Sequence, residues 1–230
     1  MKNLITRLRK LFYTHGIDGY IIPKNDEFFS EHANKDRLKK ITNFTGSAGY
    51  ALILKNRNFL FVDSRYTIQA KIESGKKFEI FSYEKVFDFK KIKDLIIGLD
   101  PNLFTSEQIK KIFPKKNIKV IKENLIDKIT KHKKLKINKF YSLNEKITGQ
   151  SHLTKINYIT RFLKKNKFDH IFISAPENVA WLLNIRGKDS PTSPIPNSHL
   201  LISHNGKKIL IAPKIKLKNL IMILIFVKWL

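Results

Sequence analysis

A pattern that occurs twice in the 230 residues constrains the fold more than any other feature of the sequence. An amphipathic helix, a short loop, an aspartate and an apolar strand follow one another at the start of the chain, and the same series begins again near residue 156. The two aspartates, Asp18 and Asp169, are 151 positions apart (169 − 18), and adding 151 to four apolar residues on one face of the first helix gives four apolar residues of the second. We interpret this as two copies of one α/β unit; the alternative is two unrelated helix–strand pairs of ordinary pattern. The corresponding residues are Ile5 and Ile156, Leu8 and Ile159, Leu11 and Phe162, and Phe12 and Leu163.

Strands and helices alternate through both copies, which is typical of an α/β fold. We therefore predict two related domains, each a mixed β-sheet flanked by helices, with the second incomplete. The second copy contains a hairpin around Asn205-Gly206, a pair that favours a type I′ turn. In the first copy the predicted elements are strand 18–23, hairpin 49–63, helix 64–73, strand 78–81, helix 86–96, a strand into 99–101, a helix after the capping box of Thr105 and Gln108, strand 118–121 and helix 123–129.

Changes of composition along the chain set the predicted domain boundaries. Residues 1–130 form the first domain, the lysine-rich residues 131–146 a linker, and residues 147–213 the second, incomplete domain. Residues 214–230 form an aberrant apolar tail whose dense apolar run is far shorter than the ~20 residues that span a bilayer. We favour a premature stop after a frameshift as the origin of this tail, and the alternative is a short interfacial anchor flanked by lysines.

The charge balance raises the question of a polyanionic partner. The chain has 45 Lys and Arg against 19 Asp and Glu, a formal net charge of +26. Lysine dominates and is scattered through almost every segment, whereas nucleic-acid readers favour clustered arginine and stacking aromatic residues. An AT-rich coding sequence accounts for the abundance of Lys, Ile, Asn and Phe. We predict no nucleic-acid and no membrane partner, and a basic module for nucleic acid or anionic membrane remains the alternative function.

Several classes of catalytic site have no basis in the sequence. There is no cysteine, which excludes disulfides, thiolate chemistry and cysteine-based zinc sites and fits a cytoplasmic location. HExxH, P-loop, Rossmann and G-x-S-x-G patterns are absent. His32, near Asp26, Glu27 and Glu31, is the best isolated metal candidate, but one histidine is a weak signal. We therefore predict no catalytic residue, no metal ligand and no cofactor in this chain.

Asp63 and Arg65 stand where an apolar strand passes into a helix. The Asp63 carboxylate is placed to cap that helix. Arg65 then lies in the first turn, where a cation is unfavourable to the helix dipole. One interpretation is that a carboxylate holds Arg65 there; the other is a surface arginine on a tolerant helix.

Five segments in this order resemble the N-terminal part of the Xaa-Pro aminopeptidases, the aminopeptidase P family of the creatinase and methionine-aminopeptidase-like superfamily. The resemblance runs from about residue 4 to about residue 213, and the long, cytosolic, three-domain type is most similar. The segments are YIIPKNDEFFSEH (20–32), ITNFTGSAGYALI (41–53), LFVDSRYTIQA (60–70), ENLIDKI (123–129) and AWLLNIRGKDSPTSP (180–194).

The resemblance implies two related N-terminal α/β domains followed by a catalytic domain of the pita-bread fold. In the family a dinuclear metal centre, usually manganese, removes an N-terminal residue that precedes proline. Its ligands, two aspartates, one histidine and two glutamates, all lie in the third domain, so none is carried over to this sequence. We therefore expect a truncated, non-catalytic part of a metallopeptidase that is inactive alone.

The resemblance assigns one functional residue. The family has an Asp-Gly-Arg-Tyr segment whose arginine contacts bound peptide, and the matching residue is Arg65 within Asp63-Ser64-Arg65-Tyr66. Ser64 replaces the usual glycine and would strain the turn if that position needs an unusual backbone angle. The expected partners are a peptide substrate at Arg65 and a separately encoded catalytic domain; gene decay is the alternative to such a split enzyme.

Overall fold

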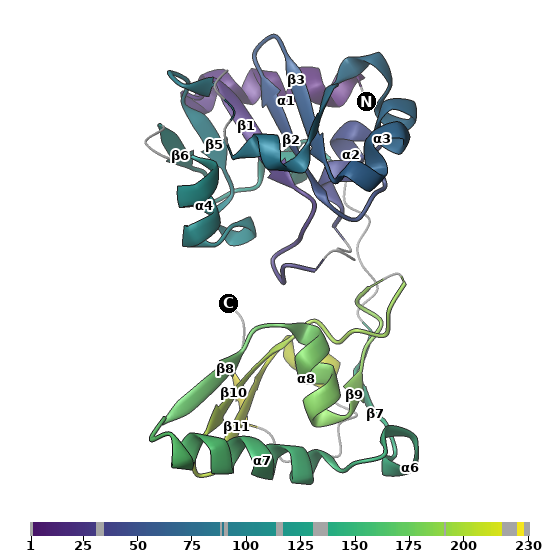
Figure 1. Cartoon of the computed structure of the whole chain (residues 1–230), viewed down its shortest axis with the longest axis vertical. Coiled ribbons are helices and arrows are strands. Elements are labelled where there is room, and N and C mark those ends of the chain that lie inside the picture. The colour runs from purple at the N-terminus through teal and green to yellow at the C-terminus, as the bar shows by residue number, and fades with distance from the viewer. Residues whose placement is uncertain are drawn as a thin grey trace. The chain divides into compact units, whose positions relative to one another are not determined.

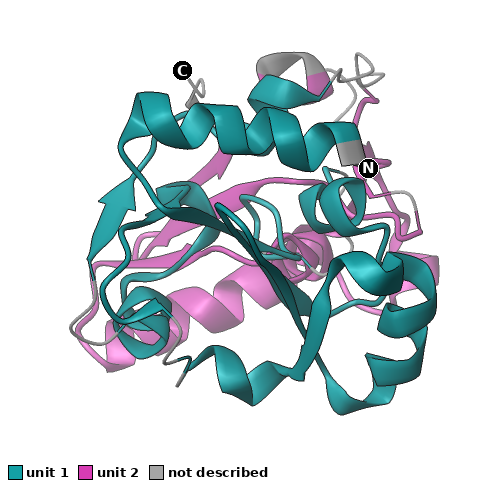
Figure 2. Cartoon of the chain, turned by 90° about the horizontal axis from the view of Figure 1, so that it is seen from above, with its two compact units in different colours: residues 1–134 teal, residues 135–230 magenta. Residues whose placement is uncertain are grey.

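The computed structural model describes residues 2–30, 35–87, 89, 92–113, 117–130, 138–190, 192–217 and 225–227. The chain divides into two compact units, residues 1–134 and residues 135–230 (Figure 2). Within the described residues no helix combines the length and apolar character that a membrane crossing requires.

The first unit is built on a six-stranded mixed sheet with the order β4-β3-β2-β1-β5-β6 (Figure 1). β1, β2 and β3 are antiparallel neighbours, whereas β4 joins β3, β5 joins β1 and β6 joins β5 in parallel. The strands are β1 Gly19–Pro23, β2 Gly49–Leu54, β3 Asn58–Val62, β4 Glu79–Ser82, β5 Ile97–Leu99 and β6 Ile118–Val120.

Both faces of the central strands β1, β2 and β3 are covered, because neighbouring strand residues point to opposite faces and both sets are mostly apolar and buried. Tyr20 and Ile22 belong to one core, which α1, α2 and α5 complete, and Ile21 belongs to the other, with residues 86–113. The helices are α1 Lys2–His15, α2 Arg37–Thr42, α3 Thr67–Ser74, α4 Ser106–Ile112 and α5 Leu125–Ile129.

Most elements of the first unit lie where the sequence predicts them. The capping box of Thr105 and Gln108 forms at the start of α4. The helix predicted over 86–96 does not form in the described residues of that range; a 3₁₀ helix, η3 Tyr83–Val86, precedes it instead. Val86, Phe89 and Ile92 are buried at every third position, a spacing that fits a tighter, irregular backbone better than an α-helix.

The second unit has a four-stranded sheet with the order β12-β11-β10-β8 and a separate pair, β7 with β9. Helices α7 and α8 pack on the four-stranded sheet, and Ile156, Leu182 and Leu200 lie in their shared core. The strands are β7 Tyr141–Ser142, β8 His170–Ile173, β9 Ile185–Arg186, β10 His199–Ser203, β11 Lys208–Ile211 and β12 Ile225–Val227, and the helices are α6 Glu145–Thr148, α7 His152–Lys165 and α8 Pro176–Leu183.

Regular structure also occurs in ranges predicted as linker and tail. β7 lies within the predicted linker 131–146, and α6 begins in it. In the predicted tail, Lys214–Leu217 form a 3₁₀ helix, and the Nζ of Lys216 lies 2.7 Å from an Asp189 carboxylate oxygen. β12 pairs in parallel with β11.

Candidate substrate-contacting site

The segment Asp63-Ser64-Arg65-Tyr66 follows β3 directly and leads into α3. Residues Ser64–Tyr66 form a 3₁₀ turn, and the Asp63 Oδ1 accepts a hydrogen bond from the Arg65 backbone N–H at 3.0 Å. The cap predicted for Asp63 is therefore confirmed. The Arg65 side chain lies just past the C-terminal end of β3 and is 72% exposed.

Arg65 is held by the same carboxylate. Its Nε donates to Asp63 Oδ1 at 2.8 Å and its Nη2 donates to Oδ2 at 3.2 Å, so the pairing is bidentate. The guanidinium carbon also lies 5.5 Å from the centre of the Tyr66 ring. These hydrogen bonds lower the pKa of Asp63, which keeps the carboxylate ionised. The interpretation that a carboxylate holds the arginine in this position is confirmed.

Ser64, in place of the family's usual glycine, causes no backbone strain. The described non-glycine residues with positive φ are Phe29, Asn43, Lys167 and Asn184, and Ser64 is not among them. A serine therefore adopts this 3₁₀ turn without the conformational freedom of glycine.

The loop 43–48 packs beside this segment and fixes Tyr66. The Tyr66 hydroxyl and Ser47 Oγ are 3.0 Å apart, and the Tyr66 ring meets the buried Phe44 ring edge to face at 5.9 Å. A Cβ on Gly46 would lie 2.2 Å from the Phe44 ring, so only glycine allows this close approach. Gly46 thus permits the close packing of this loop against Phe44.

Glu73 of α3 ties the same loop to the helix. Its carboxylate accepts from the Thr45 backbone N–H at 2.7 Å and from the Thr45 hydroxyl at 2.6 Å. Burial alone would raise the pKa of Glu73, but these hydrogen bonds outweigh it and lower the pKa. These hydrogen bonds link the loop to α3, the helix that follows Arg65.

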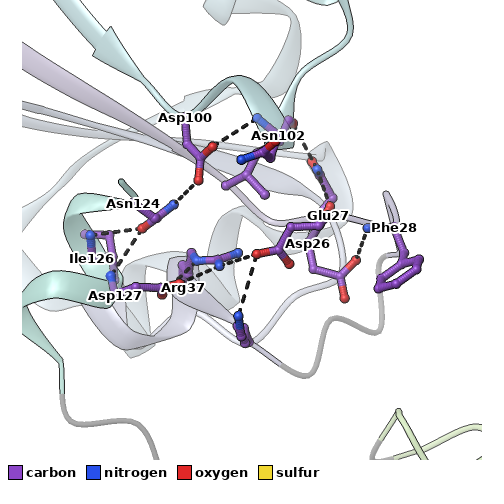
Figure 3. A network of polar contacts seen from close by, with 12 residues as sticks. Asp26, Glu27, Phe28, Arg37, Asp100, Asn102, Asn124, Ile126 and Asp127 are labelled. Carbon is purple, nitrogen blue, oxygen red and sulfur yellow. Dashed lines mark hydrogen bonds and ion pairs between the residues drawn. The ribbon is translucent and has the colours of Figure 1, made fainter. Parts of the chain in front are cut away.

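A buried arginine, Arg37, joins two segments that the sequence shows only separately (Figure 3). It is 1% exposed, and its Nε and Nη2 donate to the two carboxylate oxygens of Asp127 at 2.9 and 2.6 Å. Nη2 also donates to Glu27 at 2.6 Å. Sequence reasoning missed this residue. The sequence held one indication of its burial. Arg37 lies four residues before Ile41, so both side chains share the inner face of α2.

Asp26 and Asn124 order the two segments that meet at Arg37 (Figure 3). Asp26 Oδ1 accepts from the backbone N–H groups of Phe28 at 3.0 Å and Ser30 at 3.3 Å. Burial raises the pKa of Asp26, and those two hydrogen bonds only partly oppose the rise. Asn124 caps α5 and donates to Asp100 at 2.9 Å. The network orders the loop after β1 against the start of α5.

The described residues do not fit a metal centre. Among them no group of three or more His, Cys, Asp or Glu side chains converges as metal ligands would. The metal candidate His32 and its neighbour Glu31 lie outside the described residues. We therefore derive no metal-dependent step from this chain.

Comparison with known proteins decides the family. A family model described as Creatinase/Prolidase N-terminal domain matches residues 5–129, and a second of the same description matches residues 130–223. The chain belongs to the creatinase/prolidase N-terminal domain family. Each unit thus corresponds to one such domain, which confirms the predicted α/β fold of two related mixed-sheet domains.

Curated relatives of this creatinase/prolidase N-terminal pair are Xaa-Pro aminopeptidases. The chain is 32% identical to a probable Xaa-Pro aminopeptidase P of Laccaria bicolor over 83% of its own length and 32% of that protein. It is 28% identical to Xaa-Pro aminopeptidase 1 of Dictyostelium discoideum over 87% of its length and 36% of that protein. The chain therefore spans about a third of the length of these relatives, and the predicted resemblance to them is confirmed.

A solved structure shows the same arrangement of elements. The X-prolyl aminopeptidase of Caenorhabditis elegans, described as a cytosolic enzyme with a di-nuclear active site, matches 94% of this chain with a TM-score of 0.83 and 25% identity. The match covers 39% of that enzyme's chain.

Proposed function

We propose that this chain supplies the N-terminal, non-catalytic part of an Xaa-Pro aminopeptidase-like metallopeptidase and that Arg65 contacts its bound peptide. The family match and the Xaa-Pro aminopeptidase relatives support the enzyme class. One observation carries the role of Arg65: its side chain is 72% exposed and yet paired with a bidentate carboxylate.

A fixed, exposed guanidinium suits recognition of an extended peptide. Its N–H groups are donors in a rigid plane, which match peptide carbonyl and terminal carboxylate oxygens. Because Asp63 already orients the group, less side-chain freedom is lost when a peptide binds. Arg65 would hold the peptide, and this chain's residues would take no part in bond cleavage.

Hydrolysis in this proposal belongs to a catalytic domain outside these 230 residues. A dinuclear manganese centre there would supply an activated water and polarise the peptide carbonyl. We infer a cytoplasmic location, which the cytosolic Caenorhabditis enzyme and the lack of cysteine support.

Two measurements on the purified 230-residue chain test the proposal. With manganese and a Gly-Pro or Arg-Pro dipeptide, we expect turnover equal to that of a metal-free control. With a longer Xaa-Pro peptide, we expect weak, saturable shifts of the Arg65 side-chain NMR signals.

The variant Arg65→Ala should weaken this peptide binding about tenfold, as expected for loss of a charge-assisted hydrogen bond. Arg57→Ala is the matched control, because Arg57 is also exposed in the first unit and pairs with a carboxylate, that of Glu79. Cleavage well above the metal-free control would refute the non-catalytic role. Equal binding by the Arg65→Ala variant and the unchanged chain would refute the role of Arg65.

A further inference from the structure

The positive charge of Arg65 is balanced by its neighbour Asp63. A guanidinium has one positive charge and five N–H donors in one plane. Asp63 accepts from two of these donors, the Nε–H at 2.8 Å and one N–H of Nη2 at 3.2 Å. Because the same hydrogen bonds lower the pKa of Asp63, its carboxylate stays ionised. The two side chains together are therefore neutral, although the arginine is exposed.

The backbone holds Asp63 beside the guanidinium. Its Oδ1 accepts the backbone N–H of Arg65 at 3.0 Å as the cap of the 3₁₀ turn Ser64–Tyr66. A carboxylate that moved away would lose this hydrogen bond as well as the two from the side chain. Asp63 therefore stays in place when a ligand approaches Arg65.

Tyr66 restricts the approach to the guanidinium from one face. The Cζ of Arg65 lies 5.5 Å from the centre of the Tyr66 ring. That ring is itself fixed by the contacts of its hydroxyl with Ser47 and of its edge with Phe44. Three N–H groups of the guanidinium, two on Nη1 and one on Nη2, point away from the Asp63 carboxylate in the same plane. We therefore expect a ligand to reach Arg65 in the plane of the guanidinium, on the side away from Asp63.

A carboxylate and a carbonyl group meet this neutral pair differently. A ligand carboxylate is attracted by Arg65 but repelled by Asp63, so little net Coulomb attraction remains to offset its loss of hydration. A peptide carbonyl has no net charge for Asp63 to repel, and its oxygen still accepts from a charged donor. The pairing therefore removes the advantage that a carboxylate would otherwise have at an arginine.

We infer that Arg65 binds a main-chain carbonyl oxygen of an extended peptide and gives no preference to a terminal carboxylate, because Asp63 neutralises it. This inference rests on the proposed role of Arg65 and narrows that role to one kind of acceptor. The favoured substrate class is a peptide with at least one residue after the proline, since its proline carbonyl is part of a peptide bond. A dipeptide has a terminal carboxylate at that position instead. Asp63 acts through Arg65 and is a positioning residue.

Two forms of one peptide test the preference. Gly-Pro-Gly with a free carboxylate and the same tripeptide with a C-terminal amide differ in charge at one end only. NMR titration of the full 230-residue chain, followed at the Arg65 Nε–H signal and at constant ionic strength, should give affinities for the two forms that agree within about twofold. Clearly tighter binding of the free acid by the unchanged chain would overturn the inference.

A matched pair of chain variants shows whether Asp63 sets the preference. Asp63→Asn keeps a side-chain oxygen that can cap the turn and accept from Arg65, but it removes the negative charge. This variant should bind the free acid about threefold more tightly than the amide, the size expected for one exposed ion pair. Glu79→Gln makes the same change of charge at the carboxylate that pairs with Arg57, and it should leave the two affinities equal. An equal acid-to-amide ratio in the two variants would contradict the role of Asp63.

An acetate titration tests the role of Asp63 without a peptide. Acetate should shift the Arg65 Nε–H signal of the Asp63→Asn variant and leave that of the unchanged chain in place. A saturable shift in the unchanged chain would overturn this inference, even if peptides bind through Arg65. Equal peptide binding by the Arg65→Ala variant and the unchanged chain would instead refute the proposed role of Arg65, and this inference with it.

Discussion

Arg37 shows how much of the first unit depends on one side chain. It is buried between Asp127 and Glu27, which lie 90 and 10 positions away in the chain. A buried cation of this kind is stable only while its partners remain, because leaving a charge unpaired in the interior is costly. Its carboxylate partners pull the pKa of Arg37 upward even though burial opposes that shift.

Replacing Arg37 by leucine should therefore lower the free energy of unfolding of the first unit by about 3 kcal/mol at neutral pH, since two carboxylates lose their cation. Urea unfolding followed by circular dichroism measures this change. Arg57→Leu is the control: its ion pair with Glu79 is about half exposed, so its loss should cost less than about 1 kcal/mol. Equal effects of the two substitutions would contradict the argument.

The free energy of unfolding that is lost on replacing Arg37 should depend on pH. Burial alone would raise the pKa of Glu27, but Arg37 outweighs this and lowers it. A carboxyl group with a lowered folded pKa contributes stability above its unfolded pKa, near 4.5, and loses that contribution as the pH falls through the folded value. The difference between Arg37→Leu and the unchanged chain should therefore shrink at acid pH, which the same unfolding measurement checks.

At the scale of elements, the tie between the loop 43–48 and α3 depends on Glu73. Removing its carboxylate by Glu73→Ala leaves the Thr45 backbone N–H and hydroxyl without their acceptor. We expect amide exchange at Thr45 to accelerate at least about tenfold, because loss of a charged acceptor is equivalent to roughly 1.5–3 kcal/mol. Glu107→Ala, an exposed site in the first turn of α4, should leave that exchange unchanged.

The sequence predicted those elements whose deciding contacts join residues close together in the chain. The caps at Asp63 and Thr105 are set by residues two or three positions away, so the sequence reveals them. Arg37 was missed because its partners are distant in the chain, and no local pattern marks a buried ion pair. The segment 86–96 was predicted as a helix, but Val86, Phe89 and Ile92 are buried at every third position, a spacing that follows tertiary packing.

At the scale of the whole molecule, the first unit holds two cores made from its own residues. Residues 1–134 expressed alone should therefore fold, because a unit with its own core does not require its neighbour. Their amide NMR spectrum should overlay the corresponding signals of the full chain. A collapsed spectrum would show instead that the first unit needs residues 135–230.

The cation–π contact between Lys155 and Trp181 affects the choice of a fluorescence probe for unfolding. Both tryptophans of the chain, Trp181 and Trp229, belong to the second unit. The ammonium group of Lys155 lies 4.4 Å from the centre of the Trp181 ring, so indole emission responds to disturbance of α7 and α8. Tryptophan fluorescence therefore follows the unfolding of the second unit directly, and the effect of losing Arg37 in the first unit is followed by circular dichroism instead.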